Sequence, residues 1–127
     1  MKGIRSLIFL VAMLLITGFY SLRILWRCRR QTSQDVAALG RGWGQANLRA
    51  LNRLCRLSYR VEGLERIPSG AVVYLCKHQS AWETMALWAI LPIQQKSWIL
   101  KRELLHIPLF GWALRCFNPI AIDRDHP

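Results

Sequence analysis

The sequence has few acidic residues. Asp and Glu number 7 against 18 Lys and Arg in a chain of 127 residues, which gives a formal net charge of +11. A balance this basic favours a polyanionic partner, such as nucleic acid, an anionic membrane surface or a phosphorylated substrate. No recognised DNA- or RNA-binding motif accompanies the charge, so we do not expect nucleic acid as a partner. The hydrophobic fraction of 53% favours a membrane instead.

Paired cysteines and a serine-nucleophile motif are also missing. The 4 cysteines form no C-x-x-C pair and no cluster with histidine, which argues against a zinc site. They are Cys28, Cys55, Cys76 and Cys116. Cys76 falls in an apolar run and Cys116 in an apolar helical pattern, so we expect both to be buried free thiols. No G-x-S-x-G sequence is present, which argues against Ser80 as a nucleophile.

Charge is absent from Ser6 to Leu22, and this segment is strongly apolar. If Arg23 snorkels, the segment extends to Trp26, which is about the length that spans a bilayer core. A cleaved signal peptide is the alternative, since Lys2 and other basic residues precede the run. No small-x-small cleavage site precedes the arginines that follow, so a retained anchor is favoured.

Basic residues flank this anchor on both sides, and the larger cluster follows it. That cluster comprises Arg23, Arg27, Arg29 and Arg30. If the helix spans the membrane, the positive-inside rule then places the following domain in the cytoplasm. A helix embedded in one leaflet, with both flanks on the same face, is the other possibility.

The next part of the chain divides into a connector and an amphipathic helix. Gln31 to Gly44 has three glycines around Trp43, and we expect a loosely structured connector there. From Gln45 to Tyr59, leucines define one face and arginines recur at three- and four-residue steps. Such a basic helix fits an anionic bilayer surface, and an ordinary surface helix with a solvated basic face fits equally well.

The stretch from Ala71 to Leu91 contains the candidate catalytic residues. Ala71 to Cys76 has the pattern of a buried strand, a polar turn follows, and a helix is expected from Trp82 until Pro92 ends it. His78 lies in the turn and Glu83 on the first helical turn. An imidazole and a carboxylate at a strand end can serve as a base and its orienting partner. The local alternative is a capping box, S-x-x-E, from Ser80 to Glu83.

Strands and helices alternate in the rest of the chain. The patterns predict a strand and turn over Val61–Pro68, a strand over Ser97–Leu100 and a helix over Lys101–His106 that Pro108 interrupts. A second helical piece over Gly111–Phe117 and a strand over Pro119–Asp123 follow. The alternation predicts the α/β fold class with a mixed or parallel sheet.

Three blocks in this half resemble the glycerolipid acyltransferase family, the 1-acylglycerol-3-phosphate acyltransferases. H-Q-S-A-W-E at His78–Glu83 resembles the family's H-x-x-x-x-D signature, and V-E-G-L-E-R-I-P before it resembles the lead-in. L-K-R-E-L-L-H-I-P-L-F-G-W at Leu100–Trp112 is similar to the second block, which A-I-D-R at Ala121–Arg124 completes. The resemblance covers Tyr59–Arg124.

Two departures from the family pattern are visible. Glu83 stands where the family usually has Asp, so the geometry at His78 must adjust to one more methylene. The family's third block, of Pro-Glu-Gly-Thr-Arg type, has no match, and neither does the fourth. We therefore expect the N-terminal portion of such an enzyme, divided into an anchor (1–27), a basic connector with an amphipathic helix (28–60) and a truncated acyltransferase domain (61–127).

The resemblance implies acyl transfer from acyl-CoA or an acyl carrier protein to the sn-2 hydroxyl of 1-acylglycerol 3-phosphate, giving phosphatidate. It implies His78 as the general base and Glu83 as its orienting carboxylate. Lys101 and Arg124 are the implied phosphate ligands. No metal or resident cofactor is implied.

The implied partners are lysophosphatidate, the acyl thioester and anionic membrane lipid, at a bacterial inner membrane with the catalytic domain in the cytoplasm. Acylation of glycerol 3-phosphate or another lysolipid is an alternative, and so is a non-catalytic membrane-surface module.

Overall fold

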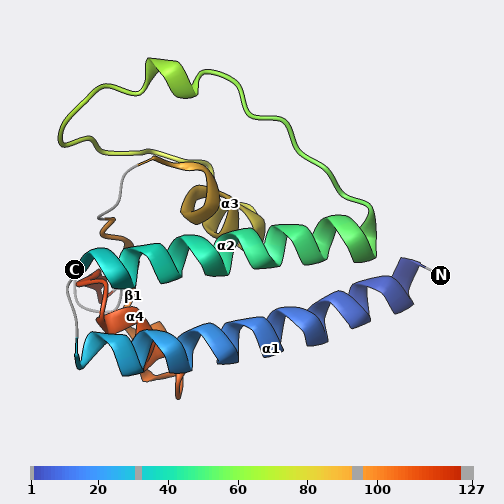
Figure 1. The fold of residues 1–127 in the computed structure, drawn as a ribbon, viewed down its shortest axis with the longest axis horizontal. Coiled ribbons are helices and arrows are strands. Elements are labelled where there is room, and N and C mark those ends of the chain that lie inside the picture. The colour runs from blue at the N-terminus through green and yellow to red at the C-terminus, as the bar shows by residue number, and fades with distance from the viewer. Residues whose placement is uncertain (1, 31–32, 93–95, 124–127) are drawn as a thin grey trace.

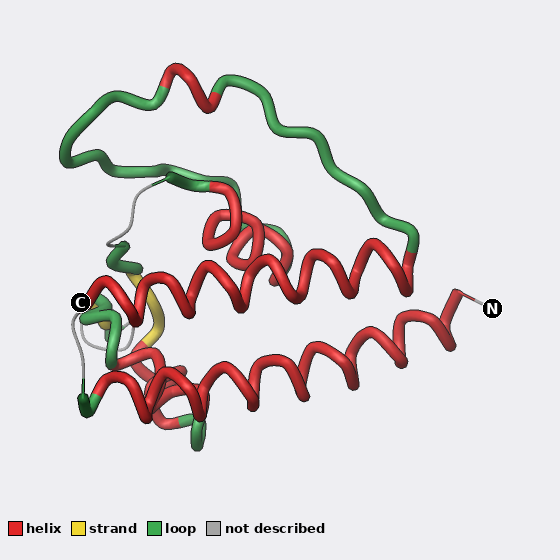
Figure 2. The backbone as a smooth tube through the Cα atoms, in the orientation of Figure 1, coloured by secondary structure: helices red, strands yellow, loops and turns green. Residues whose placement is uncertain are grey.

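The computed structural model describes residues 2–30, 33–92 and 96–123. Two long antiparallel helices, α1 (Lys2–Cys28) and α2 (Ser33–Cys55), lie side by side (Figure 1). A long irregular segment then returns the chain to α3 (Ala81–Ile90), which packs against α2 (Figure 2). The rest comprises β1 (Ile99–Lys101), a 3-10 helix η2 (Arg102–His106), α4 (Phe110–Arg115) and β2 (Ile120–Ile122).

Helix α1 matches the predicted anchor. Gly3–Cys28 is long and apolar enough to cross a membrane, and most of that stretch is exposed. Its exposed apolar side chains include Leu7, Val11, Leu15 and Phe19. Such a surface is unfavourable in water and is of the kind that lipid hydrocarbon can bury.

The segment expected to be a loose connector is the first half of α2, so that prediction was wrong for the residues described. Its glycines are positions of close helix contact. A Cβ atom on Gly44 would lie 2.5 Å from the Met85 carbonyl oxygen, and one on Gly40 would lie 2.6 Å from the Trp88 ring. Glycine therefore lets α3 approach the α2 backbone, and helix–helix packing compensates for the low helix propensity.

A polar contact joins the two helices, and a second one lies within α2. The Trp43 indole N–H donates to the Thr17 hydroxyl of α1 at 3.0 Å. Asn47 is fully buried on α2, and its amide donates to the Trp43 carbonyl at 3.0 Å. The amphipathic helix predicted as far as Tyr59 ends earlier, at Cys55.

The C-terminal part confirms the α/β prediction. Strands β1 and β2 pair in parallel, with Ile99 opposite Ile120 and Lys101 opposite Ile122. Helices η2 and α4 form the crossover between them, as a parallel strand pair requires. Helix α3 begins and ends where predicted, within one residue of Trp82 and Leu91.

Two other predicted strands are not present in the described chain. Ala71–Cys76 is irregular, with Val73 86% and Leu75 96% exposed, and Val61–Pro68 contains only the 3-10 turn η1 (Leu64–Arg66). An apolar β-branched run becomes a strand only where another strand offers hydrogen bonds, and β1 and β2 are the one described pair.

The two cysteine predictions came out differently. Cys76 is exposed, because the run that carries it is not buried. Cys116 is half-buried at the end of α4, where burial and the neighbouring Cys28 thiol raise the pKa of its thiol to about 12. Cys116 is therefore a protonated, unreactive thiol near neutral pH.

Candidate functional site

The candidate site lies at the turn into α3, where Ser80 caps the helix. The Ser80 hydroxyl accepts a hydrogen bond from the Trp82 backbone N–H at 3.2 Å. In return, the Glu83 carboxylate accepts one from the Ser80 backbone N–H at 2.9 Å. The capping box predicted from S-x-x-E is therefore confirmed.

The capping box holds the Glu83 carboxylate in one orientation. Besides the Ser80 backbone N–H, the Ser80 hydroxyl donates to it at 3.0 Å and the Gln79 backbone N–H donates at 3.2 Å. Hydrogen bonding from the backbone N–H of Glu83 itself, with further bonds from Ser80 and Gln79, holds the pKa of this carboxyl below its usual value, against a smaller desolvation effect. Glu83 is consequently an ordered anion at neutral pH.

The imidazole of His78 faces this anion. Its Nδ1 atom lies 3.9 Å from Glu83 Oε2, beyond hydrogen-bond length. The His78 side chain is 69% exposed while that of Glu83 is 17% exposed, so the ring is the more accessible member of the pair. An approach of about 1 Å would close the bond, and catalytic contacts are often this long without substrate.

Removal of the cap should weaken α3 without removing either member of the His78–Glu83 pair. We expect Ser80→Ala to lower the free energy of unfolding by about 1 kcal/mol, because the Trp82 N–H loses its acceptor. Thermal denaturation followed by circular dichroism would measure this. Ser58→Ala is the matched control, since Ser58 is an exposed serine in the irregular segment after α2. Equal loss in both variants would contradict the capping role.

Of the two predicted phosphate ligands, Lys101 lies within the described residues. Lys101 ends β1, and its ammonium pairs with the Glu103 carboxylate at 2.9 Å. Arg124 lies outside the described residues. Its neighbour Asp123 binds the Arg102 guanidinium at 3.2 Å, which ties the end of β2 to the start of η2.

Two cations that the sequence did not single out secure the other end of α3. The Lys96 ammonium donates to the Leu87 and Trp88 carbonyls, at 3.3 and 3.1 Å, and the Arg41 guanidinium donates to the Leu91 carbonyl at 2.8 Å. Burial, and then the nearby Arg41 charge, lower the pKa of Lys96 to about 8. Both groups satisfy carbonyls at the helix terminus and are occupied structurally.

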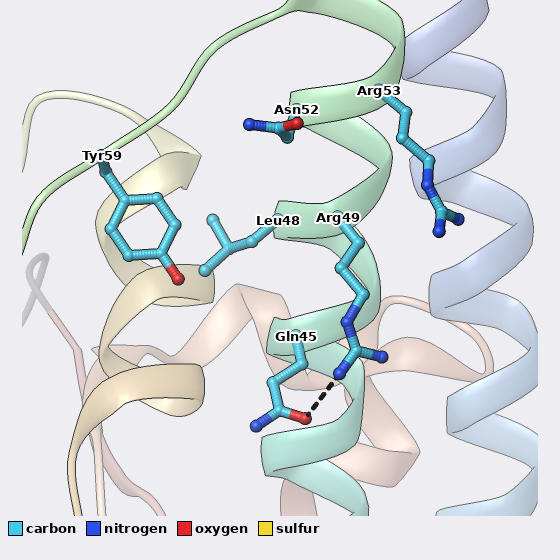
Figure 3. A pocket seen from close by; sticks show the side chains of 6 residues that line it. All are labelled: Gln45, Leu48, Arg49, Asn52, Arg53 and Tyr59. Atoms are coloured by element: carbon cyan, nitrogen blue, oxygen red, sulfur yellow. Dashed lines mark hydrogen bonds between the residues drawn. The ribbon is translucent and has the colours of Figure 1, made fainter.

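A pocket opens between α2 and the segment that follows it (Figure 3). Its lining residues are Gln45, Leu48, Arg49, Asn52, Arg53 and Tyr59. The Tyr59 ring meets the Trp82 ring edge-on, with 5.7 Å between centroids, so the pocket wall touches the first turn of α3. The arginine spacing was visible in the sequence, but the contribution of Tyr59 depends on the return of the chain to α2.

A metal centre finds no support in the described part of the chain. Within residues 2–30, 33–92 and 96–123, no three His, Cys, Asp or Glu side chains gather closely enough to hold an ion.

Comparisons with known proteins point to one family. The acyltransferase family model matches residues 58–127. The chain is 53% identical over 72 residues to a 1-acyl-sn-glycerol-3-phosphate acyltransferase of Pseudomonas aeruginosa, covering 56% of this chain and 27% of the relative. A Helicobacter pylori protein of the same name is 37% identical over 84 residues, covering 62% and 35%.

A third relative matches almost the whole chain. The chloroplastic 1-acyl-sn-glycerol-3-phosphate acyltransferase BAT2 of Brassica napus is 26% identical over 127 residues, which cover 98% of this chain and 33% of the relative. The chain thus spans about a quarter to a third of the length of these curated relatives. No solved structure matches significantly.

Proposed function

The chain belongs to the acyltransferase family, and from this premise we propose that its protein transfers an acyl group from a thioester to the sn-2 hydroxyl of 1-acylglycerol 3-phosphate. The product is phosphatidate. The observation that carries the proposal is the exposed His78 imidazole, which faces an ordered Glu83 carboxylate. The names of the bacterial relatives support the choice of acceptor.

The chemistry proposed for His78 follows from which ring nitrogen is free. Nδ1 faces Glu83, so Nε2 is left to accept the proton of the substrate hydroxyl as its oxygen attacks the thioester carbonyl. The tetrahedral adduct then expels the thiolate, and the imidazolium returns the proton to the sulfur. The Glu83 carboxylate stabilises the imidazolium in between, as the acid of a serine-protease triad does.

The remaining ligands are assigned by chemistry and position. We assign Lys101 and Arg124 to the acceptor phosphate, because cations at the ends of β1 and β2 would share one edge of the parallel pair. The donor is acyl-CoA or an acyl carrier protein thioester. No resident cofactor takes part in the proposed steps.

The membrane placement draws on the helix pair. We propose a bacterial inner membrane with the catalytic domain on the cytoplasmic side, where the anionic leaflet attracts the basic α2. Of the two arrangements of α1, the one-leaflet arrangement fits the packing. A spanning α1 would draw α2 and its charged Arg49 and Arg53 into the hydrocarbon, at substantial cost.

A panel of acceptors tests the proposed reaction. The full-length protein, purified in detergent, would be supplied with radiolabelled acyl-CoA and one of three acceptors: lysophosphatidate, glycerol 3-phosphate or lysophosphatidylethanolamine. We expect kcat/KM for lysophosphatidate to exceed the others by about tenfold or more, because the other acceptors lack either its acyl chain or its phosphomonoester.

The same panel separates the competing functions. Preference for glycerol 3-phosphate would reassign the acceptor and retain the family chemistry. Salt-sensitive binding to anionic liposomes without transfer to any acceptor, from either acyl-CoA or acyl carrier protein, would contradict the proposal and indicate a membrane-surface module.

A further inference from the structure

The pocket against α2 has the composition of an anion site. We propose that Arg49 and Arg53, with the amides of Gln45 and Asn52, bind the phosphate of a lipid headgroup in this pocket. Its volume of about 350 Å³ is within the usual range for small-molecule sites. We call it the α2 pocket.

The two arginines are placed to act together. They are four residues apart on α2, so their side chains emerge on one face of the helix, about 5–6 Å apart at Cβ. Figure 3 shows both extending in the same direction along the helix. Like charges at this spacing repel each other. An anion bound between the two guanidinium groups would be attracted by both of them.

Neither arginine is neutralised by the described chain. The described ion pairs include those of Arg60, Arg66, His78, Lys101 and Arg102, and none of these involves Arg49 or Arg53. Arg49 makes one long contact, at 3.5 Å, to the Gln45 amide oxygen, which is also a pocket group. The chain has 18 basic and 7 acidic residues, and we assign the charge that complements the α2 pocket to a ligand.

The opposite wall of the pocket is apolar. Leu48 is buried beneath it, and the half-exposed Tyr59 ring stands across from the arginines (Figure 3). A lining with guanidinium groups on one side and an alkyl and aromatic surface on the other matches an amphiphile better than a free inorganic anion. The glycerol and first methylenes of a lipid can lie on Leu48 and Tyr59 while the phosphate meets the arginines.

The position of the pocket links it to lipid and to the candidate site. Helix α2 packs along α1, whose apolar side chains are exposed for a bilayer. Through Tyr59 the pocket contacts Trp82, the residue before Glu83. A lipid phosphate held here would belong to a lipid other than the acceptor, whose phosphate is assigned to Lys101 and Arg124. That distinction from the acceptor rests on the proposed function, whereas phosphate binding by the α2 pocket does not.

Binding measured without turnover tests the proposal. The full-length protein would be placed in phosphatidylcholine nanodiscs with saturating lysophosphatidate and no acyl donor, and binding of a soluble short-chain phosphatidylglycerol would be measured by microscale thermophoresis. We expect Arg49→Gln with Arg53→Gln to raise the Kd about tenfold or more, because charge-assisted contacts are lost. Arg60→Gln with Arg66→Gln removes the same charge outside the pocket and should change the Kd by less than about threefold.

Two arms identify the source of the phosphate. If the pocket takes any phosphate, soluble glycerol 3-phosphate will compete with the short-chain phosphatidylglycerol in the wild type. If it takes a bilayer lipid, phosphatidylglycerol in the nanodisc will compete and glycerol 3-phosphate will not. Either pattern supports the α2 pocket if the competition is lost in the Arg49/Arg53 variant, and competition that persists in the variant contradicts it.

One result would overturn it. An equal Kd change in the pocket variant and the Arg60/Arg66 control would mean that only net charge attracts the lipid. Arg53→Glu reverses the charge at an exposed helix position, so it should have a larger effect than the substitutions to Gln. We expect this variant to abolish lipid binding in the α2 pocket. The binding test and the transfer test can give different answers. If the pocket variant loses lipid binding but the wild type transfers no acyl group, the proposed reaction is refuted and phosphate binding by the α2 pocket is retained.

Discussion

His78→Ala should lower acyl transfer to lysophosphatidate by about 10²- to 10⁴-fold, the range expected for loss of a general base. The substitution removes the only imidazole that faces the Glu83 carboxylate in the described chain. The ring is largely exposed and precedes the first residue of α3, so the fold should be retained. The measurement is kcat/KM in the full-length protein with radiolabelled acyl-CoA.

The matched control is His106→Ala. His106 is an exposed histidine at the end of η2 and has no assigned role, so transfer should stay within about twofold of the wild type. Liposome flotation of both variants should show unchanged membrane association, because α1 and α2 are untouched. Undiminished transfer by His78→Ala would remove His78 as the base.

Gly44→Ala should destabilise the protein by about 1–3 kcal/mol, although Ala is ordinarily the better helix former by about 1 kcal/mol. The new Cβ would lie 2.5 Å from the Met85 carbonyl oxygen and 2.9 Å from the Ala89 backbone nitrogen. Both neighbours are backbone atoms of α3, so the strain is relieved only if α3 moves away from α2. Thermal denaturation in detergent, followed by circular dichroism, would show a lower Tm.

Gly18→Ala is the control for that experiment. Gly18 is also inside a helix, but nothing lies within 4 Å of a Cβ placed there. The substitution should leave the Tm unchanged or raise it slightly through helix propensity. A Tm for Gly44→Ala equal to that of Gly18→Ala would contradict the close packing of α2 on α3. Because α3 carries Glu83, we also expect Gly44→Ala to reduce acyl transfer.

Glu83 has two structural demands placed on it. Its carboxylate completes the capping box with Ser80 and also faces His78. Both demands fall on Oε2, which accepts from the Ser80 backbone N–H and hydroxyl and lies 3.9 Å from His78 Nδ1. Because one oxygen has about two acceptor positions, a bond from His78 would replace the Ser80 hydroxyl contact. The cap orders the group before substrate arrives, which is the arrangement that an orienting carboxylate needs.

Local features of the sequence determined the elements that depend on local physics. The uncharged run after Ser6 predicted a helix long enough for a membrane, and α1 is one. Ser80 and Pro92 marked the limits of α3, because capping and the missing proline N–H act within a few residues. The short strands near Ile99 and Ile120 were also predicted, and the blocks around His78 identified the family.

The tertiary structure decided whatever depends on a distant partner. Gly40 and Gly44 signal a flexible connector when met alone, but α3 at their backbone makes them contact points of a helix. Ala71–Cys76 has the composition of a strand, but no described strand pairs with it. The α2 pocket exists only because Tyr59 returns to face Leu48 and the arginines. Hydrogen bonds between strands and contacts between helices require two segments, and the sequence of one segment cannot specify where the other lies.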